Sequence, residues 1–407
     1  MDKIASKTTI FSYLALAAFP LMKANINSIF IIICCLFTLY DFLKNKKKII
    51  FNPKVLVLTL VFWMFLFYEI LSLSLDLKNI LLHLPFLVLP LLFVFKPNYI
   101  NLKVKEYSLL VFQGSVIVQS LLYLVVFLQK HSINSIFYID NYNIPLFRTY
   151  VLENTSLDIH PTYFSAFLLF SLTISLFNGL KKVEDKNMIF HVANIIITTF
   201  LIFVFISKII VIILALTILL YIFFELRNNR HFIKTLFVFI FLGGSVIFCF
   251  KNLIKKRFNE VRTEINRPLV GDYHNSINIR VAIFKCSIDL LKNAPIFGYG
   301  SHLQNKLNNC YKNNNDSNFY LISVYNTHNY YLNLILYGGW FFFLAFLYYI
   351  YYLIFKQNYP LLIIIFIVQV LLINLTENFL SRHHGIVLFI YFISLFLNPK
   401  NIFRKHL

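Results

Sequence analysis

Two short segments of the chain carry side chains suited to acid–base chemistry. One is Asn326-Thr-His328-Asn329-Tyr-Tyr, and the other is Thr376-Glu377-Asn-Phe-Leu-Ser-Arg382-His383-His384. A neutral imidazole at His328 can accept a proton from an attacking hydroxyl or orient that hydroxyl. Glu377 can orient a histidine or pair with Arg382. The structural alternatives are an interfacial histidine bonded to a helix terminus and an ordinary ion pair.

Three further residues carry charge or polarity next to apolar stretches. Lys208, in Phe205-Ile-Ser-Lys208-Ile, lies between two apolar runs with almost no loop. It is either a lysine that reaches the membrane interface or a fixed cation that meets an anion. The Arg280 guanidinium suits phosphate oxygens, although a helix-surface arginine is the commoner role. His160 precedes Pro161 and either lines the same cavity or caps a helix.

Other kinds of site have weaker support in the sequence. There is no Walker loop, HExxH, paired-cysteine motif or dinucleotide fingerprint, and Asp, Glu and His are too scattered to predict a metal site. Cys286 and Cys310 both fall in one polar segment, so a disulfide is chemically possible in an oxidising compartment. Their spacing alone leaves that pairing open.

The elements that must position these residues are long and apolar. The chain is 59% hydrophobic and 13% charged, whereas a soluble domain is about 45–50% apolar and about 25% charged. Uninterrupted apolar runs of this kind predict membrane-spanning helices. We expect 12 spans, at about 10–21, 28–43, 55–75, 81–95, 108–128, 161–176, 195–206, 209–224, 235–250, 330–355, 361–373 and 386–397.

The distribution of charge predicts the orientation of these spans. With both termini in the cytoplasm, the inside segments hold 20 of the 37 Lys and Arg, and the short outside segments hold six. This asymmetry is what the positive-inside rule predicts. The remaining 11 lie in one long segment, about 251–329, which can cross regardless of its charge. A basic external surface makes nucleic acid a poor partner and favours an anionic lipid or a phosphate-bearing substrate.

We therefore expect one all-α membrane domain with two external excursions. Residues 1–250 should form nine transmembrane helices, with an external loop at about 130–160. Residues 251–329 should form a large external cap loop, and residues 330–407 should form three more helices and a cytoplasmic tail. Within the cap, Ile277, Val281, Phe284, Ile288 and Leu291 predict one apolar helix stripe that ends at Asn293-Ala-Pro295. The stretch 305–318, which contains seven Asn, is expected to be loop.

The order of these features resembles the O-antigen ligase/polymerase superfamily. The residues that carry the resemblance are Ser207-Lys208, Ile279-Arg280, Asn293-Ala-Pro295-Ile-Phe-Gly298-Tyr-Gly300, Thr327-His328-Asn329-Tyr330-Tyr331-Leu332 and Tyr337-Gly338-Gly339. The resemblance implies a GT-C-like membrane fold in the bacterial inner membrane, with its active site facing the periplasm. It implies transfer of a glycan from undecaprenyl diphosphate to an acceptor hydroxyl, such as one on lipid A core, with inversion and without metal or cofactor.

The resemblance also implies roles for individual residues. Arg280 would hold the diphosphate and His328 would activate or orient the acceptor. The family commonly has a second arginine where this chain has Lys208, which keeps the charge but loses the bidentate fork. Asn329, His160 and Glu377 complete the expected substrate-binding set.

Several functions share these residues, and the sequence does not separate them. Within the superfamily, the alternatives to ligation are polymerisation of repeat units and transfer to protein. Outside it, the alternative is a flippase or transporter for a lipid-linked polysaccharide. Transporters often have internal repeats and charges at the bilayer midplane. No repeat is visible here, and Glu69 is the main acidic residue inside an apolar run. Convergence of the candidate site residues in one cavity would favour transfer chemistry.

Overall fold

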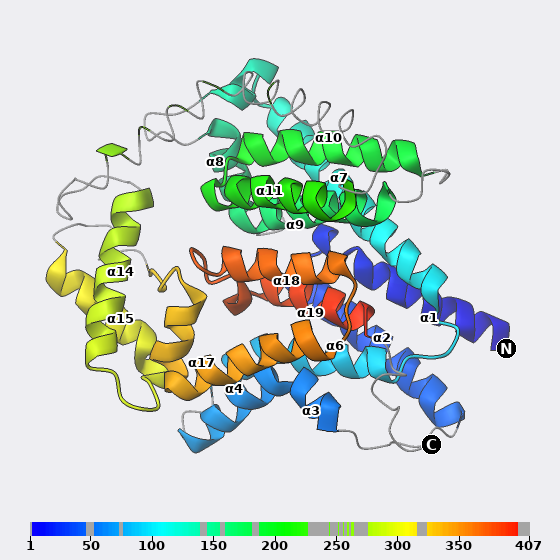
Figure 1. The fold of residues 1–407 in the computed structure, drawn as a ribbon, viewed down its shortest axis with the longest axis horizontal. Helices are drawn as coiled ribbons and strands as arrows, with labels where there is room; N and C mark the ends of the chain where they lie inside the picture. Colours follow the sequence, from blue (N-terminus) through cyan, green and yellow to red (C-terminus); the bar gives the residue numbers. More distant parts are fainter. Residues whose placement is uncertain are drawn as a thin grey trace. The chain divides into compact units, whose positions relative to one another are not determined.

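The computed structural model describes residues 2–45, 53–72, 76–138, 145–154, 159–180, 187–226, 276–315 and 324–397, with a few isolated positions between 244 and 263. Every secondary-structure element in these ranges is an α-helix, a 3-10 helix or a π-helix, as Figure 1 shows. The expected all-α class is therefore confirmed for the part of the chain that the structure describes.

Seven helical segments of the described chain are long and apolar enough to cross a membrane. They are Ala24–Lys44 (α2), Leu77–Val94 (α5, Leu77–His83, and α6, Pro85–Val94), Leu102–Leu128 (α7), Pro161–Gly179 (α9, Pro161–Ile174, and η3, Ser175–Gly179), Met188–Phe205 (α10), Lys208–Glu225 (α11, Lys208–Tyr221, and η4, Ile222–Leu226) and Tyr330–Lys356 (α17). The remaining α-helices are Asp2–Ala17 (α1), Pro53–Leu58 (α3), Leu60–Leu71 (α4), Leu146–Asn154 (α8), Ser276–Lys292 (α14), Leu303–Asn314 (α15), Leu361–Ile373 (α18) and His383–Leu395 (α19).

The count of 12 spans stays a prediction. The helices α4, α18 and α19 are apolar but shorter than a full span. The expected span at 235–250 lies outside the described residues except for Gly244.

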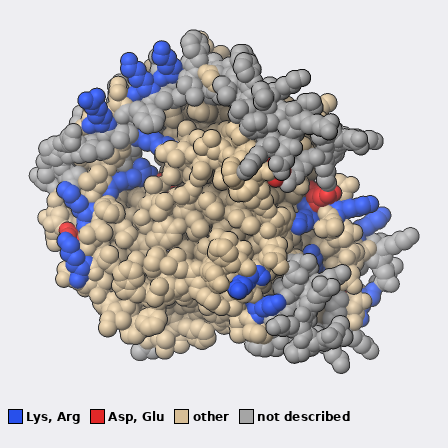
Figure 2. All heavy atoms as spheres, viewed as in Figure 1, with Lys and Arg blue, Asp and Glu red and all other residues tan. Residues whose placement is uncertain are grey.

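Side chains on these helices present apolar surface to the surroundings. Leu43 is 65% exposed, Ile212 62% and Phe355 67%. The face seen in Figure 2 is mostly tan, with few charged atoms among the described residues. Such surface would aggregate in water but is matched to lipid. The chain is therefore a multi-pass membrane protein.

The chain folds as two compact units. The first comprises Met1–Leu16, Ala24–Lys105 and Arg267–Leu407, and the second comprises Ala17–Lys23 and Glu106–Asn266. In the first unit α19 packs against α6, α17 against α4, and α14 against both α15 and α17. In the second unit α9 is the central helix, since all 14 of its residues are buried and it contacts both α10 and α11.

The long helix α17 breaks in its N-terminal half. Gly339 has φ 72° and ψ −172°, which is not helical. A side chain at Gly339 would overlap the carbonyl oxygen of Ile296, and one at Gly298 would overlap that of Tyr337. Two glycines therefore let the turn after α14 approach the backbone of α17, and Tyr299 N donates to Leu336 O at 2.7 Å.

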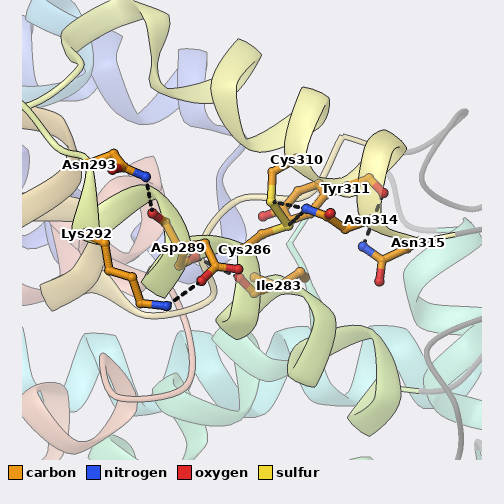
Figure 3. The surroundings of a disulfide bond; sticks show 10 residues. Ile283, Cys286, Asp289, Lys292, Asn293, Cys310, Tyr311, Asn314 and Asn315 are labelled. Carbon is orange, nitrogen blue, oxygen red and sulfur yellow. Dashed lines mark hydrogen bonds and ion pairs between the residues drawn. A yellow bond between two sulfur atoms is a disulfide. The ribbon is translucent and has the colours of Figure 1, made fainter.

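The helices α14 and α15 form a small cap in the first unit. Its core contains Ile279, Ala282, Ile283 and Cys286 from α14, and Leu303, Leu307 and Tyr311 from α15. A disulfide joins Cys286 to Cys310, which settles the pairing that their spacing left open. Figure 3 shows the two side chains pointing toward each other, with Asn314 Nδ2 donating to Cys310 Sγ at 3.1 Å.

Two expectations for the cap were wrong. The predicted helix is present as α14. Its buried face is not the predicted stripe, since Phe284 is 53% exposed whereas Ile283 and Cys286 are buried. Most of the Asn-rich stretch expected to be loop is helix α15. Leu303, Leu307 and Tyr311 recur every four residues, so burial of this face against α14 outweighs the low helix propensity of Asn.

Candidate functional site

A buried carboxylate joins a guanidinium and an imidazole in the first unit. Arg280 Nη2 donates to Glu377 Oε1 at 2.6 Å, and His328 Nδ1 lies 3.2 Å from Glu377 Oε2. The Glu377 side chain is 5% exposed, while those of Arg280 and His328 are 39% and 27% exposed. The structure thus brings together three of the six predicted site residues, and the two that can reach a substrate are the more exposed ones.

The three residues come from different parts of the chain. Arg280 lies in the first turns of α14, His328 two residues before α17, and Glu377 in the segment between α18 and α19. Ninety-seven residues separate Arg280 from Glu377. Only the fold, and no local motif, makes this arrangement.

The backbone at His328 is strained and firmly held. Its φ is 44°, in the left-handed region that a non-glycine residue rarely adopts. His328 N donates to Asn326 Oδ1 at 2.9 Å, and Thr327 Oγ1 donates to Asn329 O at 2.9 Å. Thr327 Oγ1 also lies 3.1 Å from Asn378 Oδ1. Strain of this kind persists where its surroundings fix it, often at functional sites.

Asn329 connects the two segments that carry the histidine and the carboxylate. Its Oδ1 accepts from Leu332 N at 2.9 Å and so caps α17, while its Nδ2 donates to Leu375 O at 3.1 Å. Tyr330 N donates to Asn374 O at 2.9 Å. These bonds hold the start of α17 against the end of α18. They give Asn329 a structural role in positioning these segments. Its contact with substrate stays a prediction.

The geometry indicates which nitrogen of His328 carries a proton. An ionised carboxylate only accepts hydrogen bonds, so the contact with Glu377 requires a proton on Nδ1. In the neutral ring this leaves Nε2 as the acceptor. A base held in this way can receive a proton from a hydroxyl, and the neighbouring carboxylate stabilises the resulting imidazolium.

Lys208 and His160 lie in the second unit. Helix α10 ends at Phe205, and α11 begins at Lys208 after Ile206, whose φ is 41°. The lysine adds its charge to the positive end of the helix dipole, a combination that favours anions. His160 precedes α9, and its Nδ1 accepts from Thr162 N at 3.2 Å. It therefore caps that helix, as one of its two expected roles required.

Arg148, which the sequence did not single out, lies close to the start of α11. From α8, its Nη1 donates to Phe205 O and its Nη2 to Thr162 Oγ1, both at 3.0 Å. The guanidinium thus joins α8, α9 and the end of α10, three residues before Lys208. The available signal was a single arginine in the short loop at 130–160.

Glu69 takes part in a separate buried network of the first unit. It is fully buried and accepts from Asp76 N at 3.1 Å, from Asn79 Nδ2 at 2.9 Å and from the hydroxyl of Tyr337. The carboxylate thereby joins α4, α5 and α17. These contacts give Glu69 a structural role in holding the three helices, which weakens the case for a transport site around it.

Comparison with known proteins supports a family assignment for part of the chain. Residues 193–347 match the family model described as O-antigen ligase. The matched stretch includes Lys208, Arg280 and His328, so the resemblance expected from the sequence is confirmed there. It supports a function of the O-antigen ligase or polymerase type. No curated protein matches the chain.

Proposed function

We propose that this protein is an inverting glycosyltransferase that moves a glycan from undecaprenyl diphosphate to an acceptor hydroxyl, such as one on lipid A core. The observation that carries the proposal is the bridge from Arg280 through Glu377 to His328. In this bridge one carboxylate holds both a guanidinium suited to phosphate and an imidazole suited to act as a base. The match to the O-antigen ligase family model over 193–347 supports a lipid-linked glycan as the substrate class.

In this proposal His328 Nε2 takes the proton of the acceptor hydroxyl as its oxygen attacks the anomeric carbon. The bond from that carbon to the diphosphate oxygen breaks, and the diphosphate leaves with the electron pair. Glu377 keeps the ring in the tautomer that exposes Nε2 and stabilises the imidazolium that forms.

Arg280 offsets the charge that develops on the leaving diphosphate. Its guanidinium has five N–H donors, of which Nη2 supplies one to Glu377, and its side chain is 39% exposed. Arginine forms bidentate bonds with phosphate oxygens, and such fixed donors act most strongly where charge grows in the transition state. A diphosphate is already a good leaving group, so this chemistry requires no ATP.

For Lys208 and His160 we propose contacts with substrate, argued from their own unit. The cation of Lys208 stands at the N-terminus of α11, where both charges favour phosphate. His160 caps α9 through Nδ1, so Nε2 is the nitrogen proposed to meet substrate.

We place the reaction at the periplasmic face of the inner membrane. Under the predicted topology the short cytoplasmic segments hold 20 of the 37 Lys and Arg, while 251–329 lies outside. The donor, the acceptor and the membrane are then the expected partners.

Polymerisation of repeat units and glycan transfer to protein are the alternatives within the same chemistry. A flippase for lipid-linked polysaccharide is the alternative outside it. The flippase is disfavoured because Glu69 is bonded within a structural network of α4, α5 and α17. Arg280 and His328 instead meet at Glu377.

Surface-glycan analysis of a deletion strain tests the proposal. Wild type should restore capped lipid A core, whereas His328→Ala and Arg280→Ala should leave core unmodified and lipid-linked polymer accumulating. Lys285→Ala, an exposed cation on the same helix as Arg280, is the matched control and should behave as wild type. Core bearing a single repeat unit in the deletion strain would indicate a polymerase. Normal capping by His328→Ala, with the protein present in the membrane, would falsify the assignment.

A further inference from the structure

The turn between the cap helices presents apolar side chains on the surface of the first unit. Ile296 is 74% exposed and Phe297 is 64% exposed. Only Asn293-Ala-Pro295 separates them from Lys292, the last residue of α14. Burial of these two adjacent apolar side chains in an apolar partner would be favourable, because water solvates them poorly.

The backbone of this turn is held in place. Gly298 N donates to Pro295 O at 2.9 Å, and Tyr68 Oη donates to Phe297 O at 2.9 Å. Gly339 in the break of α17 makes room for the carbonyl of Ile296. The backbone that carries the exposed side chains is therefore fixed in position relative to α4 and α17.

The exposed edge of the turn continues the apolar surface of a membrane span. The ring of Phe297 stacks on that of Phe341, with centroids 5.8 Å apart and an interplanar angle of 13°. Phe341 is 63% exposed and its neighbour Trp340 is 56% exposed. The same helix then presents Leu344, which is 59% exposed. Because α17 is long and apolar enough to cross a membrane, this surface is suited to contact acyl chains.

We propose that Ile296 and Phe297 insert into the acyl chains of the bilayer at its outer surface and anchor the cap there. Trp340, beside the break, stands at the kind of position where aromatic residues mark the membrane interface. The occupant is bulk lipid, because the edge is continuous with the lipid-facing side of α17. This anchor goes beyond the proposed reaction and does not depend on it.

The anchor has a consequence for the cap helix that carries Arg280. Helix α14 runs directly into the turn, and it packs against α15 and α17. In Figure 1 the two cap helices lie at the kinked end of α17 within the same unit. Insertion of the turn therefore fixes α14 at the membrane surface, where a lipid-linked substrate would be met.

Depth-dependent fluorescence quenching tests the anchor in the full-length protein. The chain has two tryptophans, so Trp63→Phe and Trp340→Phe give a silent background. Phe297→Trp is the probe, and Asn309→Trp, on the exposed face of α15, is the matched control. The protein is placed in phospholipid vesicles that carry nitroxide on their acyl chains and contain no polyprenyl lipid.

The expected result is strong quenching of the Phe297→Trp probe by nitroxide near the glycerol end of the acyl chains. Aqueous iodide should quench it several-fold less than the Asn309→Trp control. Equal quenching of both probes by iodide, without nitroxide quenching, overturns the proposal. Nitroxide quenching that appears only after polyprenyl phosphate is added also overturns it, because the turn would then bind that chain. Ile296→Trp gives a second probe if Phe297→Trp disturbs the stack on Phe341.

Discussion

Glu377 and His328 lie within hydrogen-bonding distance, with 3.2 Å between Oε2 and Nδ1, although 49 residues separate them along the chain. The carboxylate is almost fully buried and also receives the guanidinium of Arg280. A buried carboxylate is stable only with such partners. The same contacts determine the tautomer of the imidazole, so stability and chemistry depend on one group.

Glu377→Gln should reduce glycan transfer by about 100-fold or more, in the range of a lost acid–base contribution. The amide keeps the shape but loses the charge that stabilises the imidazolium and balances Arg280. Initial rates with a lipid-linked donor in proteoliposomes measure the effect.

Asp289→Asn is the control for removing a carboxylate. Asp289 pairs with Lys292, but their side chains are 58% and 68% exposed, and such surface pairs contribute about 1 kcal/mol or less. Its transfer rate should stay at the wild-type value. A Glu377→Gln rate equal to that of this control would exclude Glu377 from the reaction.

Cys310→Ser should destabilise the cap. The disulfide closes a separation of 24 residues, for which chain entropy gives about 3 kcal/mol. The helix α15 has few apolar side chains other than its buried stripe, so it depends on this link. Limited proteolysis of the membrane-inserted protein should cleave Cys310→Ser within 303–314. Wild type should be cleaved there only when reductant is added.

Cys34→Ser is the matched control for that measurement. Cys34 is a buried free cysteine of α2 in the same unit. Its cap should resist protease as wild type does, and become sensitive only when reductant is added. Equal resistance of Cys310→Ser would mean that packing alone holds α14 and α15 together.

Seven of the 12 expected spans overlap helical segments of the described chain that are long and apolar enough to cross a membrane, because long apolar runs dominate local structure. The pairing of Glu377 was less accessible. The nearer arginine in the sequence is Arg382, five residues on, whereas the structure pairs Glu377 with Arg280 through tertiary packing. Distance along the chain was therefore a poor guide to the ion pair.

Two features of the cap depended on burial that composition conceals. The Asn-rich stretch reads as loop, yet Leu303, Leu307 and Tyr311 make it amphipathic. The break at Gly339 lies inside a continuous apolar run, where hydropathy gives no sign of it. The Gly338-Gly339 pair was the available signal, and its meaning required the turn that packs against it.

Gly339→Ala should destabilise the protein strongly. Its φ of 72° and ψ of −172° fall in a region essentially restricted to glycine, which costs alanine about 1–3 kcal/mol, and the new methyl group would also overlap Ile296 O. Gly114→Ala is the matched control, since nothing lies within 4 Å of its added carbon and it sits inside α7. The melting temperature in detergent should fall for Gly339→Ala and should stay the same or rise for Gly114→Ala. Equal melting of the two would contradict the tight approach of the turn to α17.

Arg148→Lys should weaken the end of the second unit at which α8, α9 and α10 meet. The guanidinium donates one hydrogen bond to Phe205 O and another to Thr162 Oγ1. An ammonium lacks the planar fork that makes both at once. Loss of one bond to a charged donor lowers the free energy of unfolding by about 1.5–3 kcal/mol. Arg382→Lys, at an exposed position, should leave thermal unfolding unchanged. A normal melting temperature for Arg148→Lys would show that a point charge suffices.

Lys208→Ala should raise the KM for the lipid-linked donor by about tenfold, which corresponds to about 1.4 kcal/mol of lost phosphate binding. Lys208→Arg should keep or lower that KM, because a guanidinium adds bidentate contacts to the same charge. Neither change should alter thermal unfolding greatly, since Lys208 is part-exposed at the first position of α11. Lys130→Ala, another cation of the second unit, is the control and should leave KM unchanged. If Lys208→Ala instead lowers stability with KM unchanged, the lysine serves the helix junction and not the donor.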